Sequence, residues 1–596
     1  MNQFAGVLSS ATEAIASQLD TKGEGISVVV FNPLSIERQE VVEANVYPTG
    51  TMVRVTGPDG REVPAQVEGY SGVRRAAMMK ILFLAKVPPV GFAVYHVQPF
   101  MVVHSAMPAE STAMNAAAHS SSELKVTDSS LENARYRIQL NHDGDISSIF
   151  DKKLNRELLW APARLAFQTE KPSQWPAWNM DWSDQSKPPR GYVDGSAKIT
   201  IAERGPVRVA LRIEREAEGS KFVQTIRLSA GDAGNRVEFA NSIDWKTREA
   251  ALKATFPLTA SNPNATYNWG AATIDHPTDS EKMFEMPSHR WFDLTDQSGS
   301  FGVTILSGAK TGSDRPSDNT LRLTLIYTPG VSEAGQSYRD QGSQDFGHHE
   351  FLYGLSSHAG GWRDGDTAWQ AYRLDAPLIA FESANHRGAL GKTLSLLKVS
   401  DNGVRVMAFK KAEDSNDEVV RLVEMNGKPQ RDIRISFAAP VIAAHEINGQ
   451  ELPVGPASIA KGDLLAEFAP YEIKSYEVKL APSHVQSIPP HSEAIPLHYD
   501  LAAASNDGTK SVGGFDTAGN ALPAELLPSE IAYSGIHFKL APAATGKPDA
   551  VIARGQTIQL PAGKFNRVYL LAASANGDQQ ATFKLGDQSA DLTVQN

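Results

Sequence analysis

Short apolar runs separated by turn residues follow one another almost without pause between residues 125 and 400. The segment YRIQLNHDGDISSIFDKK alternates apolar and polar residues, turns at Asp143-Gly144, and alternates again. This pattern is typical of a β-hairpin, because successive side chains of a strand point to opposite faces of the sheet. No stretch here has the length and period of a convincing helix. We therefore expect one very large antiparallel β-sandwich over 125–400.

Runs of the same kind continue on both sides of this segment, so the fold class that we expect is mainly β, with several antiparallel sandwiches. The run ISVVVFNPLS opens one of them, and strings such as IHFKLAP and QTIQLPAGKFNRVYLLAAS belong to the last. Two stretches rich in small residues or in Pro and Ser are expected to be linkers. The expected domains are a terminal helix (1–25), a small β-sandwich (26–100), a linker (101–124), the large sandwich (125–400), a further β-sandwich (401–482), a linker (483–496) and a C-terminal β domain (497–596).

The first residues have the spacing of one amphipathic helix. Its apolar positions are Phe4, Val7, Leu8, Ala11, Ala14, Ile15 and Leu19. A single helix cannot bury such a stripe alone, so we expect it to need a partner outside this chain. These residues also lack the basic start and solid apolar run of a signal peptide.

Composition excludes several classes of protein. The chain has no cysteine, which rules out disulfides and thiolate chemistry. The net charge of −11, without a basic stripe, argues against a nucleic-acid partner. No stretch reaches the roughly 18–20 apolar residues of a membrane helix.

The order of these segments, and several strings in them, resemble bacterial α-mannosidases of glycoside hydrolase family 38. VVVFNPLSIERQEVVEANV is similar to the first sheet after that family's helical bundle, and LENARYRIQLNHDGDISSIFDKKLNREL to the start of its large sandwich. EMPSHRWFDLTDQSGSFGVTILSGAKTG and HHEFLYGLSSHAGGW extend the likeness. GQTIQLPAGKFNRVYLLAAS resembles a carbohydrate-binding-like domain of some members. The resemblance implies a galactose-mutarotase-like supersandwich over 125–400.

The resemblance also implies a retaining α-mannosidase that acts on α-mannosides in mannose metabolism and binds zinc. In that family a barrel supplies the aspartate nucleophile and the zinc ligands, upstream of the segments that this chain resembles. We therefore assign no catalytic or metal-binding residue to this chain, and expect it to be inactive without a missing or separate barrel. The helix at 1–25 would be the last piece of the bundle. Periplasmic, secreted and cytoplasmic bacterial locations all stay open, as do a truncated gene product and one half of a split enzyme.

The segment QWPAWNMDWSD (174–184) is the first candidate for sugar binding. A tryptophan can lay its ring on the C–H face of a sugar, and an aspartate can accept hydroxyl hydrogen bonds. The candidate residues are Trp175, Trp178, Asp181 and Trp182. The alternative is a loop that buried tryptophans pin to the sandwich. In the family an acid often stands where this chain has Asn179.

Two further segments supply candidates. His289 and Arg290 lie in PSHRWFDLTD, which resembles the family stretch where the sandwich approaches the barrel. Asp345 lies in RDQGSQDFG, a loop that could close over a cleft. In GHHEFLYGLSSH, adjacent histidines of a strand point to opposite faces, so only His348 and Glu350 share one. We expect His358 to lie beyond a bend, and assign no metal site there.

Two other functions stay open. The chain could be a stand-alone glycan-binding or scaffold protein. It could also be a polysaccharide lyase or sugar epimerase, since large sandwiches occur in those enzymes and act by proton abstraction. A retaining glycosidase needs two carboxyls about 5–5.5 Å apart, and sequence spacing does not show which acids of a sandwich meet.

Overall fold

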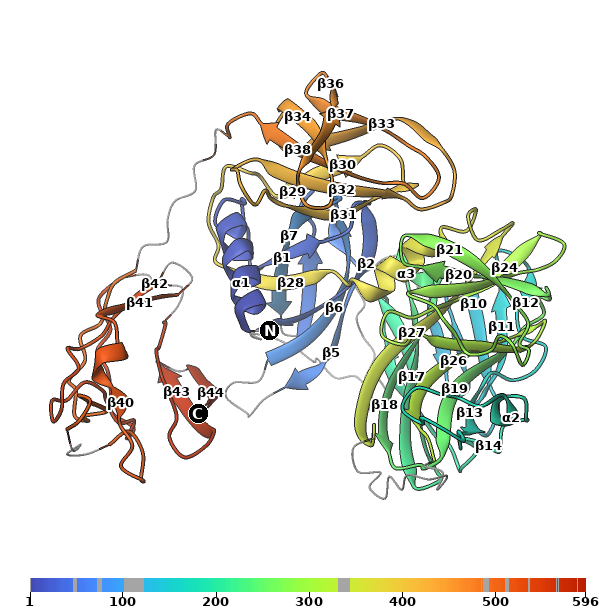
Figure 1. Ribbon diagram of the computed structural model, residues 1–596, viewed down its shortest axis with the longest axis horizontal. Helices are drawn as coiled ribbons and strands as arrows, with labels where there is room; N and C mark the ends of the chain where they lie inside the picture. Colours follow the sequence, from blue (N-terminus) through green and yellow to red (C-terminus); the bar gives the residue numbers. More distant parts are fainter. Residues whose placement is uncertain are drawn as a thin grey trace, which may run out of the picture.

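The structure is a computed structural model that describes residues 2–595 except 47–50, 72–77, 101–122, 331–343, 484, 486–491, 510–513, 534–535, 564, 566–567 and 587. Nearly all of the regular secondary structure in these residues is antiparallel sheet, which confirms the mainly β prediction. Figure 1 shows a large sandwich (green), a central sandwich (blue) with another above it (orange), and the C-terminal segment (red) on the other side.

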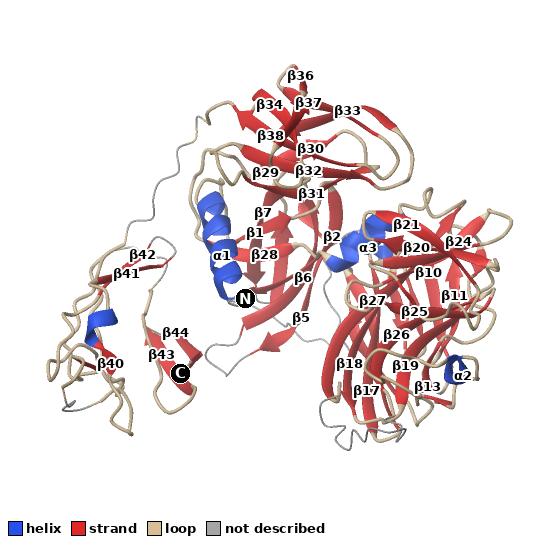
Figure 2. Cartoon of the chain, in the orientation of Figure 1, coloured by secondary structure: helices blue, strands red, loops and turns tan. Residues whose placement is uncertain are grey.

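The large sandwich is built from three antiparallel sheets (Figure 2). Its nine-stranded sheet has the order β15-β16-β17-β18-β27-β24-β23-β20-β21, its six-stranded sheet the order β14-β13-β19-β26-β25-β22, and its five-stranded sheet the order β12-β11-β10-β9-β8. The strands are β8 (Lys125–Thr127), β9 (Ser130–Glu132), β10 (Tyr136–Leu140), β11 (Ile146–Asp151), β12 (Arg156–Glu157), β13 (Arg164–Thr169), β14 (Gly191–Tyr192), β15 (Lys198–Arg204), β16 (Arg208–Ala217), β17 (Ser220–Ser229), β18 (Val237–Trp245), β19 (Ala250–Pro257), β20 (Asn264–Trp269), β21 (Ala272–Pro277), β22 (Met286–Pro287), β23 (Trp291–Thr295), β24 (Phe301–Leu306), β25 (Gly312–Ser317), β26 (Thr320–Thr328) and β27 (Gly347–Ala359).

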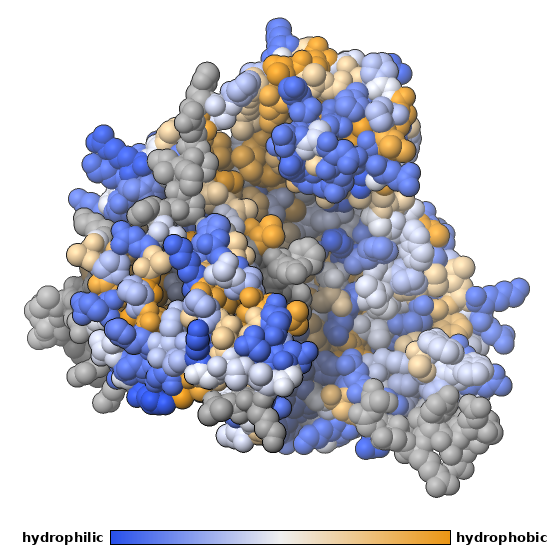
Figure 3. Space-filling view, turned by 60° about the vertical axis from the view of Figure 1, so that its left-hand side comes forward, coloured by the Kyte–Doolittle hydropathy of each residue, from blue (hydrophilic) through white to orange (hydrophobic). Residues whose placement is uncertain are grey.

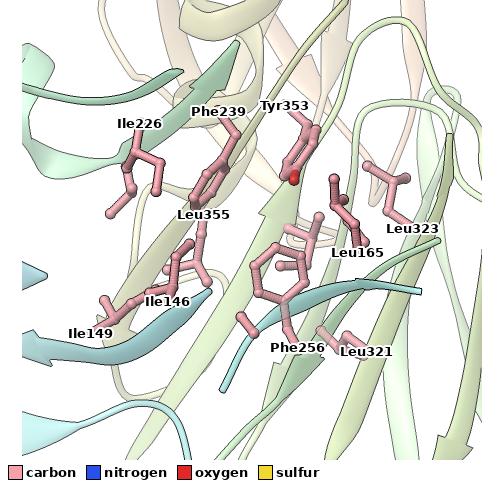
Figure 4. Close-up of a cluster of buried hydrophobic side chains, with 14 of the residues drawn as sticks. Ile146, Ile149, Leu165, Ile226, Phe239, Phe256, Leu321, Leu323, Tyr353 and Leu355 are labelled. Carbon is pink, nitrogen blue, oxygen red and sulfur yellow. The ribbon is translucent and has the colours of Figure 1, made fainter. Parts of the chain in front are cut away.

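One hydrophobic core joins these sheets. In β10 the alternation seen in the sequence becomes an alternation of burial, with Tyr136, Ile138 and Leu140 inside and the residues between them exposed. Figure 4 shows side chains of this core meeting between the sheets. The rings of Phe239 and Tyr353 stack there with centroids 4.9 Å apart. A core of this size is what lets the large sandwich hold polar loops at its rim.

The first sandwich contains strands from two distant parts of the chain. One sheet has the order β28-β1-β7-β3-β4, with β29 also on β7, and the other has the order β2-β6-β5. The strands are β1 (Ile26–Asn32), β2 (Arg38–Val46), β3 (Met52–Thr56), β4 (Glu62–Val63), β5 (Ala65–Ser71), β6 (Met78–Val87), β7 (Gly91–Phe100), β28 (Ile379–Ser383) and β29 (Thr393–Ser395). Residues 379–395, expected to end the large sandwich, therefore complete the first one.

Ion pairs fasten the first sandwich to the large one. Arg236 of β18's entry turn pairs with Glu40 of β2 at 2.9 Å, and Arg208 of β16 pairs with Glu43 at 2.9 Å. The side-chain carbonyl of Gln66 also accepts hydrogen bonds from the backbone of Val207 and Arg208. The two sandwiches thus share a polar, hydrogen-bonded contact.

Helix α1 (Asn2–Ala16) packs on the first sandwich at its C-terminal end. Ala16 and the following Leu19 are buried against Val29, Phe92 and Val94. The expectation that the helix needs a partner outside the chain is therefore wrong for this end, because the β1–β7 sheet supplies one. Val7 and Leu8 are exposed, and the side chain of Phe4 lies outside the described part.

The third sandwich follows directly. Its sheets have the orders β30-β33-β37-β36 and β31-β32-β38-β34-β35. Helix α3 (Thr367–Asp375) lies where this sandwich, the first one and the large one come together (Figure 2). The strands are β30 (Leu397–Val399), β31 (Val404–Lys411), β32 (Glu418–Glu424), β33 (Gln430–Phe437), β34 (Val441–Ile447), β35 (Pro453–Pro456), β36 (Ser458–Ala460), β37 (Asp463–Phe468) and β38 (Ile473–Leu480).

The C-terminal segment has three two-stranded sheets in its described residues. The described residues of 556–573 form no strand, although QTIQLPAGKFNRVYLLAAS alternates, because a strand also needs a hydrogen-bonding neighbour. Large apolar side chains such as Leu526 and Leu571 are exposed, and Figure 3 shows apolar patches (orange) on this side of the molecule. The strands are β39 (Ala504–Ser505), β40 (Leu522–Pro523), β41 (Glu530–Tyr533), β42 (Ile536–Lys539), β43 (Gln579–Leu585) and β44 (Gln588–Val594).

Candidate functional site

A tryptophan-rich loop covers the face of the six-stranded sheet that points away from the core. It runs from the end of β13 to β14 and contains the short helix α2 (Trp182–Gln185). Trp175 has a left-handed backbone (φ +53°), and its carbonyl accepts hydrogen bonds from the backbone of Trp178 and Asn179. This tight turn stacks the indoles of Trp175 and Trp178 on each other, with centroids 5.7 Å apart.

The two stacked indoles face solvent. Trp175 is 53% exposed and Trp178 is 80% exposed. Indoles that pin a loop to a sandwich would be buried, so these two do not serve that purpose. An exposed, oriented aromatic surface of this kind can receive the C–H face of a sugar ring.

The aspartates of the loop hold its backbone. The Asp181 carboxylate accepts a hydrogen bond from the Ser173 amide at 2.7 Å, and the Asp184 carboxylate accepts one from the Lys171 amide at 2.8 Å. Trp182 packs beside Phe284 with ring centroids 5.4 Å apart. Within the predicted segment, then, the first two tryptophans are available to a ligand, and Asp181 and Trp182 support the loop.

A cluster of charged side chains lies buried beneath the loop. The Lys253 ammonium, on β19, pairs with Glu285 and with Asp314, the latter at 2.5 Å. Arg322 of β26 donates one hydrogen bond to each carboxylate oxygen of Asp314. Burial lowers the pKa of Lys253, but the Asp314 and Glu285 carboxylates outweigh it and raise this pKa overall. The ammonium therefore stays charged inside the protein.

Glu170, at the start of the loop, is a carboxyl of this cluster whose pKa burial shifts strongly. Burial raises its pKa to about 8, and the nearby Glu285 and Asp184 add to the effect. Gln185 donates a hydrogen bond to one of its oxygens, whereas the other oxygen has no hydrogen-bond partner in the described residues. Because Glu170 is completely buried, it acts on the loop rather than on a ligand.

Tyr327 connects the loop to the sheet. Its hydroxyl, at the end of β26, donates to the Asn179 carbonyl at 2.7 Å, in the turn that carries the two indoles. Glu170, Lys253 and Tyr327 were not predicted as site residues. Lys253 could have been, since a lysine inside the apolar run AALKATFP is a sign of a buried ion pair.

The other three predicted residues lie elsewhere. The ring of His289 lies 6.1 Å from that of Trp269. Arg290 pairs with Asp375 of α3 at 3.1 Å. The backbone carbonyl of Asp345 faces His349 Nε2 at 2.8 Å. Figure 1 places α2 and α3 at different ends of the large sandwich, so Arg290 does not join the tryptophan loop.

The histidines of β27 have separate surroundings. His348 lies between the Asp244 and Glu350 carboxylates, at 2.7 and 3.3 Å, and the hydrogen bond with Asp244 raises its pKa. His358 is in the same continuous strand, so the bend expected before it is absent. It is buried and lies 2.7 Å from Asp293. Among the described residues, no group of three His, Asp or Glu side chains is placed to hold a metal ion.

This arrangement can bind and orient a ligand. The Asp181 and Asp184 carboxylates accept backbone hydrogen bonds, and Glu285 and Asp314 pair with Lys253. The exposed, pre-oriented surface is the pair of indoles. No helix in the described part of the chain is long and apolar enough to cross a membrane.

Comparison with protein families identifies three parts of the chain. Residues 131–331 match the model "Glycosyl hydrolases family 38 C-terminal domain". Residues 403–476 match "Glycosyl hydrolases family 38 C-terminal beta sandwich domain". Residues 491–596 match "AziU2-like beta-sandwich domain". The first match contains the tryptophan loop and the charged cluster beneath it.

Relatives of known name support the same relationship. The chain is 26% identical to Alpha-mannosidase 2C1 of Mus musculus over 369 residues, which is 59% of this chain and 34% of that protein. The human protein of the same name is also 26% identical, over 367 residues. The matched part thus spans about a third of each relative's length.

Solved structures show the same fold. An alpha-mannosidase from Enterococcus faecalis V583 superimposes with a TM-score of 0.62 at 18% identity, over 79% of this chain and 58% of that one. A family 38 glycosyl hydrolase from Enterococcus faecalis gives a TM-score of 0.61 at 16% identity, over 79% and 60% of the two chains.

Proposed function

Because the chain carries the C-terminal domains of glycosyl hydrolase family 38, we propose that it forms the non-barrel part of an α-mannosidase. The observation that carries this proposal is the pair of stacked, exposed indoles on the sandwich that matches the family. The named relatives, both called alpha-mannosidases, are consistent with α-mannosides as the substrate class. The reaction is proposed to be hydrolysis with retention, as the family resemblance implies.

The proposed role of the loop is to shape the rim of the sugar site. Trp175 and Trp178 would stack on a sugar ring, and the anchors at Asp181, Asp184 and Tyr327 would hold the two indoles in place before substrate arrives. A site that is organised in advance loses less entropy on binding. The large sandwich is also proposed to brace the barrel.

Zinc and the catalytic carboxylates are proposed to come from a barrel outside this sequence. No metal-binding group of three side chains is present in the described residues, so the fit of zinc to this chain is not supported. No step of the reaction is therefore assigned to its side chains. The chain alone is expected to be inactive.

Hydrolysis of a chromogenic α-mannoside, with zinc supplied, tests this proposal. The chain would be assayed alone and after mixing with a separately made family 38 barrel fragment. Turnover by the mixture only is the expected result. Turnover by the chain alone would contradict the absence of catalytic residues. No turnover by a stable mixture of the two folded parts would contradict the proposed role.

Variants of the loop sharpen the test. Trp178→Ala should raise the KM of the mixture, because the indole is exposed and available for stacking. Trp160→Ala is the matched control, since Trp160 is another exposed indole of the same sandwich outside the loop. An equal effect of both substitutions would argue against a sugar-binding role of the loop.

A second function, stand-alone glycan binding, is favoured by the same indoles. Two oriented aromatic rings on a rigid scaffold can hold a glycan without cleaving it. Glycan affinity without turnover in any mixture would support this second function over the first.

A further inference from the structure

A cavity of about 430 Å³ lies between α3 and the third sandwich. It is lined by the segments 362–369, 400–403 and 425–426, at the junction where Figure 2 shows α3. We propose that this cavity is a second carbohydrate site, which binds one neutral sugar unit away from the tryptophan loop. The choice of a sugar rests on the proposed function, whereas the presence of a ligand site rests on the cavity itself.

The walls of the cavity are fixed in place. The Trp369 indole is buried, and its Nε1–H donates to the Asn402 carbonyl at 2.8 Å. Arg363 stacks over Trp362 at 4.1 Å, and its Nε donates to the Asn426 carbonyl at 2.6 Å. The two hydrogen bonds, to Asn402 and to Asn426, join the segment around α3 to the third sandwich. A ligand would therefore meet a cavity that already has its shape.

Asp366 at the mouth has an unusual conformation. It has a left-handed backbone (φ +58°) and stands at the N-cap position of α3, yet its side chain makes no capping hydrogen bond. An aspartate normally caps a helix from an extended backbone. Left-handed non-glycine residues are strained and cluster at ligand sites. The carboxylate is thus left available to the cavity.

Further polar groups surround the mouth without hydrogen bonds of their own. The side-chain amides of Asn402 and Asn426 make no hydrogen bond within the described residues. One carboxylate oxygen of Asp401 accepts a hydrogen bond from the Gly403 amide at 2.7 Å. Its second oxygen accepts no hydrogen bond from the described residues. Donors and acceptors are therefore mixed around one opening.

This mixture favours a neutral polyhydroxylated ligand. Each sugar hydroxyl both donates and accepts, so it can donate to Asp366 or Asp401 and accept from the amides of Asn402 or Asn426. Two carboxylates disfavour an anion, since Arg363, the cation in the lining, is held by Trp362 and the third sandwich. A metal ion is disfavoured too, because no third acidic or imidazole ligand is grouped with them in the described residues.

Binding of methyl α-mannoside to the full chain tests the site. Calorimetric titration would be made in a Trp178→Ala background, so that the loop contributes little. Binding in the millimolar range is expected. Asp366→Asn should weaken it about tenfold or more, because a hydrogen bond to a charged acceptor is lost. Asparagine tolerates the left-handed backbone, so the fold should be kept.

Asp432→Asn is the matched control. Asp432 also has a left-handed backbone (φ +55°) and is exposed on the third sandwich, but it does not line the cavity. Its substitution should leave binding unchanged. Hydrogen exchange should show protection of 362–369 and 400–403 on sugar addition, lost with Asp366→Asn.

Two results would overturn the site. One is that methyl α-mannoside does not bind the Trp178→Ala chain but does bind chains in which Trp178 is kept. The other is binding that Asp366→Asn and Asn402→Ala leave unchanged. Neither would affect the proposed function, which is read from α-mannoside turnover by the mixture with the barrel. Turnover lost while the cavity still binds sugar would refute only the proposed function.

Discussion

Replacing Lys253 by Met should destabilise the large sandwich more than the loss of a surface ion pair would. Its ammonium is completely buried and is paired with both Glu285 and Asp314. Removing one partner of a buried pair costs about 3–5 kcal/mol, because the other charge stays buried. Asp314 keeps Arg322, so only Glu285 is left without its cation. We therefore expect the lower end of that range, about 3 kcal/mol.

The assay must isolate this one sandwich from the rest of a multidomain chain. Native-state hydrogen exchange of peptides from β19 and β26 gives the free energy of opening at the cluster itself. Lys198→Met is the matched control, since Lys198 pairs with Glu214 on the same sandwich but is 70% exposed. Its loss should cost about 0–1 kcal/mol.

A double substitution separates the charge from the packing. Lys253→Met combined with Glu285→Gln removes the carboxylate that was left unpaired, so part of the lost stability should return. If Lys253→Met costs no more than Lys198→Met, the buried cluster does not stabilise the sandwich and the reasoning is refuted. If the double variant is as unstable as the single one, lost packing and not unpaired charge is the cause.

Three further predictions concern single residues. Burial raises the pKa of Glu170 from 4.5 to about 8, so between these pH values the native state holds a proton that the unfolded state releases. The stability of the loop should therefore fall as the pH rises from 4.5 to about 8. Hydrogen exchange of residues 170–187 should show this fall, and Glu170→Gln should remove it. Burial lowers the pKa of His358, but Asp293 outweighs burial and raises this pKa above 6.5. The stability that the His358–Asp293 pair contributes is therefore complete below pH 6.5 and is lost as the pH rises through the pKa of the folded state. His358→Gln should cost most stability in unfolding experiments at acidic pH and less at alkaline pH. Trp178→Ala should change stability by no more than about 0.5 kcal/mol, since the side chain is exposed; a larger shift in thermal unfolding would mean that the indole supports the loop.

Much of the fold can be predicted from local pattern. The alternation in YRIQL becomes strand β10 with one buried face, because the two-residue period of a strand is visible in the sequence itself. The partner of a strand is not visible in this way. Nothing local indicates that Val30 of β1 lies opposite Ala380 of β28, since that pairing depends on the whole chain. For this reason the pattern assigns β28 and β29 to the large sandwich, whereas in the structure they pair with β1 and β7.

The candidate site could likewise be predicted only in part from the sequence. The composition of QWPAWNMDWSD indicated a special loop, and Trp175 and Trp178 are indeed exposed on it. The roles of Asp181 and Asp184 could not be predicted, because an acid that holds a backbone amide looks like any other acid in a sequence. The strand that contains His358 is continuous where a bend was expected, because residues 354–359 of β27 stay paired with β24.

The strands β28 and β29 also set an order of events during synthesis. β28 and β29, which pair with β1 and β7, follow about 300 residues after β7, which takes roughly 15–60 s at about 5–20 residues per second. Until then β1 presents an open, apolar edge that can pair with another chain. The first sandwich is thus completed only after the whole of the large sandwich has been made, and a nascent chain would benefit from a chaperone that shields this edge.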